Sequence, residues 1–585
     1  MMRSLSLSLC ILLLLAGSIF VAAIEIESSQ DAGSPKSTFP TSGLPRASPC
    51  VDSCSAQLSA CNENCVFNSM NESEEMACRT ACYQDVTPCV ERCAQRQSKE
   101  QAAAKLHKSK NPNTFESRGP QPRPPTENVG FGPEKVLNWA GYQSINGSAP
   151  GLKRHLWYWA FESRNDPSKD PLVIWLTGGP GCSSLVALFY EHGPYHIQDD
   201  LSLSLNPYSW NSNATVIYID QPVNTGYSYA DNGDWGAFSE AEIADNLFWF
   251  LQGWLEQYPK YQELPFYITG ESYAGHYVPA FAARLVAARS DPNVLPINFQ
   301  AVGIGNGLVN PLRQYQQYLP YAAAMNILPQ SSLDSMAQGL PACVAAINSC
   351  NQTSLAGLIG CLQATETCNL SQMMPFELTG LNVYDVREKC AIPPLCYNFT
   401  NVDNFLAQPE VIQALGVQGH NWQDCNRLVD LELIFAGDWM RNLADDVTTI
   451  LESGVRVVVY SGEDDFICNW YGGFDWTMNL QWSGANQFRA AENTTWISTD
   501  GQPAGSSRTA QGLTFVRVFE AGHMVPLNQP ERALDLLGRI ISGQPFDPSQ
   551  PIKKVESTNS NTKPSSPSSS HRRSHETTRP TIARE

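Results

Sequence analysis

The sequence has few charged residues, and basic ones are the scarcest. Of its 585 residues only 16% are charged, and 38 Lys and Arg stand against 57 Asp and Glu, a formal net charge of −19. Such a chain offers little basic surface for a phosphate backbone, so we expect no nucleic-acid partner. The length allows one large domain with appendages, or two to three ordinary domains.

Long apolar runs are also scarce, and the one at the N-terminus is short for a bilayer. Residues 1–23 place an Arg before an apolar run that ends in small residues, so we expect a secretory signal peptide; a membrane anchor is the alternative. Glycosylation sequons agree with a secreted or vacuolar/lysosomal protein that has no stable membrane anchor. They lie at Asn71, Asn146, Asn213, Asn351, Asn369, Asn398 and Asn493.

Cysteine, by contrast, is plentiful. One of the 18 cysteines, Cys10, leaves with the signal peptide, and eight others lie in residues 50–93 in two copies of C-x3-C-x6-C-x3-C. At about 100° per residue this spacing puts four sulfurs on one helical face. We expect a helical hairpin with a disulfide ladder; a zinc site is the alternative, and the partner of the module is unknown. The expected pairs are Cys50–Cys93, Cys54–Cys89, Cys61–Cys82 and Cys65–Cys78.

Composition divides the rest of the chain. Residues 24–49 and 547–585 are polar and low in complexity, and we expect them to be disordered. Residues 94–130 are rich in Lys, Gln and Pro and indicate a linker, which could be part of a propeptide. A globular region runs from 131 to 546.

Six apolar runs in the globular region end in glycine or acidic turns, and helical patterns follow several of them. This alternation predicts an α/β fold with a mostly parallel central sheet flanked by helices, and chemistry at the carboxyl ends of its strands. Residues 306–444 hold fewer strand signals and most of the remaining cysteines, so we expect a helical, disulfide-containing cap insertion there. The runs are DPLVIWLTGGPG, NATVIYIDQP, LPFYITGES, FQAVGIGNGLVNP, GVRVVVYSGEDD and LTFVRVFEAGH.

The stretch GESYA, with Ser272 at its centre, fits the relaxed nucleophile elbow G-x-S-x-G/A. A sharp turn from strand to helix needs small neighbours, and it exposes the serine hydroxyl. The alternative is a serine that caps the following helix.

A serine nucleophile needs a base and an acid that orients the base. His523 lies at a strand end in EAGHMVP and is the best candidate among the nine histidines. The acid should lie between serine and histidine in the chain, and Glu463, Asp464 and Asp465 follow the strand VVVY. Spacing alone leaves the choice among them open, but the chain order is that of an α/β hydrolase.

The glycine strip WLTGGPGCSS also follows a strand. Its bare backbone amides could face a developing oxyanion, although phosphate loops and plain turns look similar. The strip lacks the lysine of a P-loop.

Several long motifs in the same order resemble the serine carboxypeptidases, most of all those of the carboxypeptidase Y type. They are WLTGGPGCSSLVALFYEHGP, NPYSWNSNATVIYIDQPVNTGYSY, ITGESYAGHYVP, GNGLVNP, SGEDDFICNW and FEAGHMVP. The resemblance covers roughly residues 131–546 and excludes the Cys-rich module. It implies an α/β-hydrolase fold and a serine-type carboxypeptidase that acts on peptides and proteins with a free C-terminus, favoured at acid pH, with no metal or organic cofactor.

The resemblance also implies residue roles. The triad would be Ser272, Asp465 and His523, and the oxyanion hole would use the amides of Gly179 and Tyr273. The terminal carboxylate of the substrate would meet Thr177, Gly178, Glu191 and Glu271, and a carboxyl group can donate a hydrogen bond to it only when protonated. An apolar substrate pocket would be lined by Tyr190, Tyr384, Trp439, Ile467, Cys468 and Met524.

Thr177 departs from the family pattern, which usually has Asn there. Some plant relatives that are acyltransferases also carry Thr at this position, so acyl transfer to an alcohol is the alternative reaction. A non-catalytic binding protein is a further alternative, against which the intact triad argues.

The implied disulfides are Cys182–Cys425, Cys343–Cys368, Cys350–Cys361 and Cys390–Cys396. Together with the ladder they leave one unpaired cysteine, Cys468, three residues after Asp465.

Overall fold

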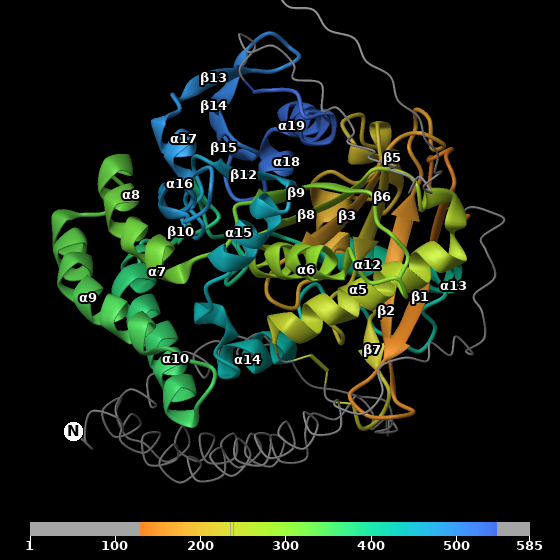
Figure 1. Cartoon of the computed structure of the whole chain (residues 1–585), viewed down its shortest axis with the longest axis horizontal. Helices are drawn as coiled ribbons and strands as arrows, with labels where there is room; N and C mark the ends of the chain where they lie inside the picture. The colour runs from red at the N-terminus through yellow and green to blue at the C-terminus, as the bar shows by residue number, and fades with distance from the viewer. Residues whose placement is uncertain (1–128, 131, 235, 238, 547–585) are drawn as a thin grey trace, which may run out of the picture.

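The computed structural model describes residues 129–546 apart from 131, 235 and 238. The expected signal peptide, the Cys-rich module with its ladder, most of the linker and the C-terminal tail lie outside these residues, as does Asn71. Within the described residues the centre is an eleven-stranded sheet with helices on both sides (Figure 1).

The six apolar runs form six neighbouring strands of this sheet, all parallel. Alternate side chains enter different cores, as Ile174 and Val173 do in the third strand of the chain. The mostly parallel sheet that the sequence predicts is therefore confirmed. In spatial order the strands are β6 (Thr215–Ile219), β3 (Leu172–Thr177), β8 (Phe266–Glu271), β9 (Phe299–Gly305), β12 (Arg456–Gly462) and β15 (Leu513–Val518).

Antiparallel strands extend both edges of the sheet. They were not evident among the apolar runs because several of their side chains are partly or fully exposed, as in the outermost strand on each edge. On one edge are β1 (Asn138–Asn146), β2 (Lys153–Phe161) and β7 (Tyr229–Ala230), and on the other are β14 (Pro503–Ala510) and β13 (Thr494–Ile497).

Helices bury the apolar side chains of both faces. One core lies under α5 (Glu240–Gln257), α6 (Ala274–Ala288), α15 (Ala444–Glu452) and α16 (Trp470–Asn479). The other lies under α4 (Leu185–Tyr190), α12 (Thr400–Leu406), α13 (Pro409–Leu415) and α19 (Pro530–Ser542). Short elements complete this part: β4 (Tyr195–Ile197), β5 (Leu203–Leu205), η1 (Trp210–Ser212), η2 (Pro259–Tyr261), α17 (Ala485–Ala490) and α18 (Val525–Asn528).

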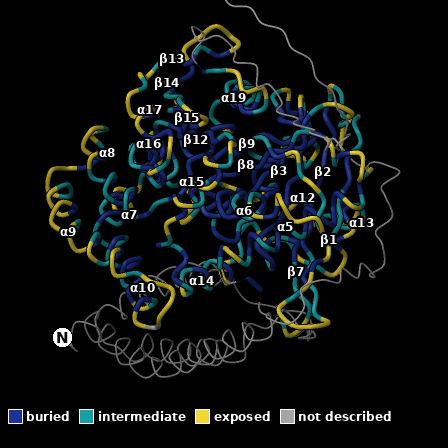
Figure 2. Tube along the Cα trace, viewed as in Figure 1, coloured by how far each residue is buried: buried dark blue, intermediate teal, exposed yellow. Residues whose placement is uncertain are grey.

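The segment between β9 and α15 is mostly helical and does not form one unit. Its first part builds an arm with its own apolar core beside the sheet (Figure 1), and the outer helix of the arm is largely exposed (Figure 2). The arm contains α7 (Pro311–Gln314), η3 (Tyr315–Gln317), α8 (Tyr318–Met325), α9 (Gln330–Ser349), α10 (Leu355–Cys368), η4 (Asn369–Met373) and α11 (Met374–Glu377). After it come β10 (Leu381–Asn382), β11 (Asp385–Lys389), α12, α13, α14 (Arg427–Phe435) and η5 (Asp438–Met440).

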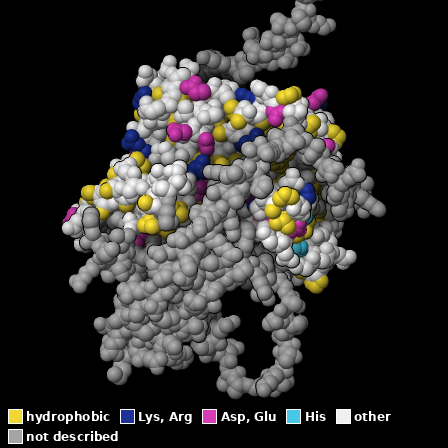
Figure 3. Space-filling view, turned by 60° about the horizontal axis from the view of Figure 1, so that its bottom comes forward, with side chains coloured by type: hydrophobic (Ala, Val, Ile, Leu, Met, Phe, Trp, Pro, Cys, Tyr) yellow, Lys and Arg dark blue, Asp and Glu magenta, His cyan; other side chains and the backbone are white. Residues whose placement is uncertain are grey.

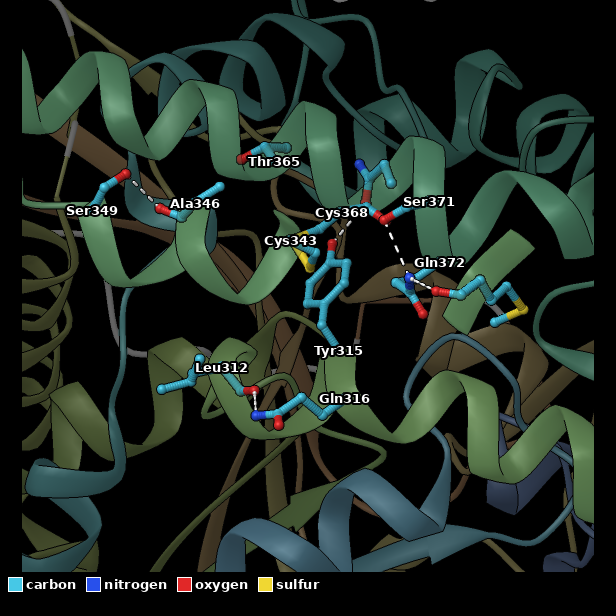
Figure 4. Close-up of a disulfide and its surroundings, with 12 residues drawn as sticks. Leu312, Tyr315, Gln316, Cys343, Ala346, Ser349, Thr365, Cys368, Ser371 and Gln372 are labelled. Carbon is cyan, nitrogen blue, oxygen red and sulfur yellow. Dashed lines mark hydrogen bonds between the residues drawn. A yellow bond between two sulfur atoms is a disulfide. The ribbon is translucent and has the colours of Figure 1, made fainter. Parts of the chain in front are cut away.

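Two disulfides tie α10 to α9 and to the residue directly after α9, Cys343–Cys368 and Cys350–Cys361. Figure 4 shows the first of them beside Tyr315, whose hydroxyl donates to Oδ1 of Asn369 at 2.7 Å. Two further disulfides are Cys390–Cys396 and Cys182–Cys425. These are the four pairs that the family resemblance implies.

The surface of the described part carries both signs of charge. On the portion visible in Figure 3, Lys and Arg side chains are interspersed with Asp and Glu rather than gathered in one patch. None of the described helices is both long and apolar enough to cross a membrane. Among the sequon asparagines in this part, Asn369 is half-buried and the others are exposed.

Candidate active site

Ser272 occupies the turn between β8 and α6 with a φ of 67°, in the left-handed region. Its amide donates to the carbonyl of Gly305 at 3.0 Å, which ties the turn to the end of β9. The flanking residues are glycines because a Cβ on Gly270 or Gly275 would lie 2.6 or 2.5 Å from a backbone carbonyl oxygen. Tyr273 is the N-cap of α6, so helix capping does not account for Ser272.

His523 and Asp465 follow β15 and β12, and their side chains form a buried pair. Nδ1 of His523 lies 2.8 Å from Oδ2 of Asp465. With its Nδ1–H donated to the carboxylate, the imidazole has Nε2 left to accept a proton. The backbone N–H of His523 also donates to the carbonyl of Tyr384 at 2.7 Å, which fixes the loop that carries the ring.

The two other acids considered after β12 point elsewhere. Glu463 pairs with Arg517 at 2.7 Å, and Asp464 lies 3.3 Å from Arg387. Spacing along the chain left three acids open, and only Asp465 among them contacts His523.

Asn306 is a residue of this cluster that the sequence did not single out. It directly follows β9 and donates from Nδ2 to Oδ2 of Asp465 at 2.7 Å. The Asp465 carboxylate oxygen thus accepts from an amide and an imidazole together. The available signal was the position of Asn306 at a strand end in GIGNG, but a single Asn has no spacing that marks it.

The glycine strip packs directly on the serine turn. A Cβ on Gly178 would lie 2.3 Å from the amide nitrogen of Tyr273 and 2.9 Å from Cβ of Ser272. Gly179 has a φ of 110°, which favours glycine. The disulfide at Cys182 and backbone hydrogen bonds on either side of it hold the strip against the segment before α14. Gly179 and Tyr273 are therefore both near Ser272, as an oxyanion hole requires.

Two buried glutamates lie beside the triad. Glu271 precedes Ser272 and Glu191 ends α4, and the two side chains interact with each other. Burial raises the pKa of Glu191 to about 7. Burial and the negative charge of Glu191 raise the pKa of Glu271 further. The pair therefore holds at least one proton at acid pH and can donate a hydrogen bond to a carboxylate.

Comparison with known proteins identifies the family of this chain. The sequence profile described as serine carboxypeptidase matches residues 130–543. The chain belongs to the serine carboxypeptidase family. It is 42% identical to carboxypeptidase Y of Candida albicans over 418 residues, 71% of this chain and 74% of that protein.

Two yeast proteins extend this likeness. Carboxypeptidase Y of Saccharomyces cerevisiae is 40% identical over 416 residues, 70% of this chain and 76% of that protein. The crystal structure of Kex1Δp, a prohormone-processing carboxypeptidase from the same yeast, is similar with a TM-score of 0.60 at 27% identity, covering 71% of this chain and 94% of that one. The family resemblance read from the sequence is confirmed: this protein is a serine-type carboxypeptidase, a hydrolase.

Thr177 is the position at which this serine carboxypeptidase departs from the expected Asn. It ends β3 and lies opposite Glu271 in the pairing of β3 with β8. The indole Nε1 of Trp175 donates to Oγ1 of Thr177 at 2.9 Å. Because the indole occupies one lone pair of the oxygen, the hydroxyl hydrogen of Thr177 remains available to donate.

The predicted pocket residues fall into separate groups. Trp439 packs on Tyr273, Tyr384 packs on His523, and both border the same core, as does Ile467. A different cluster holds Met524 and Tyr190, and a cavity of about 510 Å³ adjoins Tyr190 and Glu191. Apolar side chains therefore lie both beside the nucleophile turn and beside Glu191.

Cys468 is the unpaired cysteine of the described residues and is buried. Its Sγ, an oxygen of Asp465 and a nitrogen of His523 all lie within 4.8 Å of one another. A thiolate, an imidazole and a carboxylate can each bind a metal ion, but Asp465 and His523 are already hydrogen-bonded to each other. Burial and nearby carboxylates raise the pKa of Cys468, so its thiol stays protonated.

Proposed function

We propose that Ser272 is the nucleophile of this carboxypeptidase, with His523 as general base and Asp465 as the acid that orients it. Ser272 attacks the last peptide carbonyl while Nε2 of His523 takes its proton, and the amides of Gly179 and Tyr273 stabilise the oxyanion. His523 then protonates the leaving amine. Water, activated by the same imidazole, hydrolyses the acyl-enzyme. The observation that carries this assignment is the hydrogen bond from the His523 imidazole to Asp465.

The carboxylate of the departing residue is held by hydroxyl, amide and carboxyl donors in this proposal. Thr177 has an available hydroxyl hydrogen, Gly178 offers its backbone amide, and Glu191 with Glu271 supplies the shared proton. Because burial and Glu191 raise the pKa of Glu271 further, Glu191 ionises first, which places a negative charge beside the substrate carboxylate and leaves the Glu271 proton in a hydrogen bond within the pair. Substrate binding is therefore best at acid pH and weakens as the pH rises through the pKa of Glu191, about 7.

The enzyme acts on peptides and proteins with a free C-terminus and prefers apolar side chains near the scissile bond. The groups around Trp439 and Met524 support this preference. We place the enzyme in the secretory pathway, in a vacuole, a lysosome or the extracellular space. The four disulfides of the described residues support an oxidising compartment.

Acyl transfer to an alcohol is the second candidate, and the observation that favours it is Thr177 in place of Asn. The loss of an amide donor weakens the grip on a terminal carboxylate. In that case the acyl-enzyme would form from an ester, and an alcohol rather than water would take the acyl group.

The deciding experiment compares an N-blocked dipeptide that has a free C-terminus with the same dipeptide amidated, at about pH 5. The variants are wild type, Ser272→Ala and, as a matched control, Ser331→Ala on the exposed side of α9. Release of the last residue from the acid, slower release from the amide, no release by Ser272→Ala and normal release by Ser331→Ala support the proposal.

Two results count against it. Full activity in Ser272→Ala would remove the serine mechanism. No release from either peptide, while an organophosphorus reagent still labels Ser272, would mean a working triad with another acyl donor, and the acyltransferase would become the better proposal.

A further inference from the structure

A second buried acid pair lies behind the nucleophile turn, outside the site described above. Glu240 begins α5, and Asp438 begins η5 in the segment before α15. Both residues are 0% exposed. A buried carboxyl group without a counter-charge is unfavourable, so two together require an explanation.

Asp438 is held by donors from three directions. The Tyr273 hydroxyl donates to its Oδ2 at 2.9 Å, Nε2 of Gln352 donates to Oδ1 at 3.3 Å, and NH1 of Arg441 lies 3.8 Å from Oδ1. These contacts suit an ionised Asp438 carboxylate. Tyr273 is the residue whose amide is assigned to the oxyanion hole.

Glu240 has none of these donors. Neither of its carboxyl oxygens has an N–H or hydroxyl partner, and Asp438 is the side chain within hydrogen-bonding reach. Two carboxyl groups can make that contact only when a proton lies between them. Burial and the charge of Asp438 raise the pKa of Glu240, in agreement with a protonated Glu240 that donates to Asp438.

The groups that face this pair come from several elements. η5 and the residue after it supply the charges of Asp438 and Arg441, and α15 supplies Asp446. The N-terminal end of α6 supplies aromatic rings and an imidazole. Arg441 is thus the cation that lies near Glu240, and its charge also acts on Asp438 and Asp446. The ionisable groups that interact with Glu240 or Asp438 are Tyr273, His276, Tyr277, Arg441 and Asp446, and Asp430 of α14 acts on Tyr277.

We propose that Glu240 and Asp438 are positioning residues, which share one proton and through the Tyr273 hydroxyl fix the oxyanion-hole amide of Tyr273. The pair joins α5, the nucleophile turn and the segment before α15 at one point. Trp439, next to Asp438, adds a ring contact to Tyr273 with centroids 5.6 Å apart. The segment that supplies pocket side chains is thereby coupled to the turn that supplies the oxyanion hole.

The proton gives the device a pH dependence that is separate from carboxylate recognition. When Glu240 ionises, two negative charges face each other in the interior, and Asp438 loses a donor. The grip on Tyr273 then loosens as the pH rises. Because the effect acts on the oxyanion hole, it applies also to reagents that have no terminal carboxylate. Glu191 and Glu271 do not bind such reagents.

The test measures the rate at which a small uncharged organophosphorus reagent phosphonylates Ser272 between about pH 5 and pH 9. In wild type we expect an alkaline limb on which the rate falls. Glu240→Gln keeps a donor to Asp438 at every pH and should lose that limb while retaining its acid-side rate. Glu256→Gln, an exposed residue of the same helix, is the matched control and should keep the wild-type profile.

Two further variants separate positioning from mere folding. Tyr273→Phe and Asp438→Asn should lower kcat on a dipeptide substrate on the order of tenfold, with KM changed less than about twofold, since an oxyanion donor is misplaced. Circular dichroism at the assay temperature establishes that each variant is folded. The proposal is overturned if both folded variants have the kcat of the wild type. It is also overturned if the pH profile of Ser272 labelling in Glu240→Gln superimposes on that of the wild type.

The inference rests on the proposed roles of Ser272 and Tyr273, and the same assay distinguishes the two failures. Wild-type enzyme that is not labelled at Ser272 counts against the proposed function itself. Normal labelling of wild type with an unchanged Glu240→Gln profile counts against the acid pair alone.

Discussion

At the scale of single residues, the neighbours of each buried acid decide which hydrogen bonds it makes. Asp465 accepts hydrogen bonds from Asn306 and His523. Glu191 and Glu271 are buried against each other and keep a proton at acid pH. The same side-chain chemistry thus serves two purposes in one site, because the neighbours differ.

Glu191→Gln should make substrate binding insensitive to pH. In wild type, KM for a peptide with a free C-terminus should rise about tenfold per pH unit above the pKa of Glu191, which is about 7, because Glu191 then loses its donor proton and becomes negatively charged beside the substrate carboxylate. Gln keeps a neutral donor at all pH values. KM measured from pH 5 to pH 8 for the free acid and for the amide checks this.

The control for this experiment is Glu263→Gln, an exposed glutamate before β8, which should keep the wild-type dependence. The amidated peptide should show little change in KM with pH in any variant. If Glu191→Gln retained the alkaline rise in KM for the free acid, the glutamate pair would not be the group that reads the carboxylate.

The pair also affects stability, and the sign follows from its raised pKa values. An acid with a raised pKa in the folded state binds its proton more tightly there than in the unfolded chain. The resulting stabilisation is complete below the unfolded value, about 4.5, and is lost as the pH rises through the folded value. The glutamate pair thus favours an enzyme that is most stable on the acid side.

At the scale of elements, the site is assembled by strand ends and by close packing of backbone. The residues after β8, β9, β12 and β15 meet because these strands are parallel neighbours. The turn after β3 then packs on the turn after β8 with no space for a side chain at Gly178. The alternation of strands and helices along the chain is visible in the sequence, whereas this contact between two turns is not.

Gly178→Ala should lower kcat/KM at least about 100-fold, because the added methyl meets the backbone of Tyr273 at 2.3 Å and must displace the oxyanion hole. The measurement is kcat/KM on the free-acid dipeptide, with circular dichroism to establish folding.

Gly538→Ala is the matched control for this change. Gly538 lies in α19, and nothing lies within 4 Å of an added Cβ there. The substitution should leave kcat/KM unchanged and stabilise the protein by about 0.5–1 kcal/mol, as Gly to Ala does within helices. A folded Gly178→Ala enzyme with wild-type kcat/KM would show that the strip does not shape the oxyanion hole.

At the scale of the whole molecule, one of the four described disulfides connects segments that are far apart in the chain. Cys182–Cys425 joins residues 243 positions apart and fastens the glycine strip to the segment before α14. Closing so long a loop restricts the unfolded chain more than the short Cys390–Cys396 loop does. The bonds therefore stabilise both the fold and the position of the site.

Thiol titration of the denatured, unreduced mature protein should find one reactive thiol. The described residues hold four disulfides and one free cysteine, Cys468, and the ladder predicted in residues 50–93 would pair the other eight. Cys468→Ser should have none. Nine thiols in the wild-type protein would contradict the ladder and favour the zinc alternative for the Cys-rich module.

The sequence by itself determined the six apolar runs that form the parallel strands, the family, and the position of Ser272 and His523 at strand ends. Such features are local, since an apolar run between turn residues specifies a buried strand without reference to the rest of the chain. From the residues alone, the acid remained open among Glu463, Asp464 and Asp465, and the family resemblance was needed to choose Asp465.

Only the tertiary structure decided what depends on side chains from distant segments. It brought Asn306 to Asp465, Trp175 to Thr177, and Glu240 to Asp438, pairs that no spacing along the chain marks. It also divided the insertion between an arm with its own core and helices on both faces of the sheet. The reason is physical: a buried acid takes its protonation state from whatever charge or donor the fold places beside it, and that neighbour is fixed only when the whole core has formed.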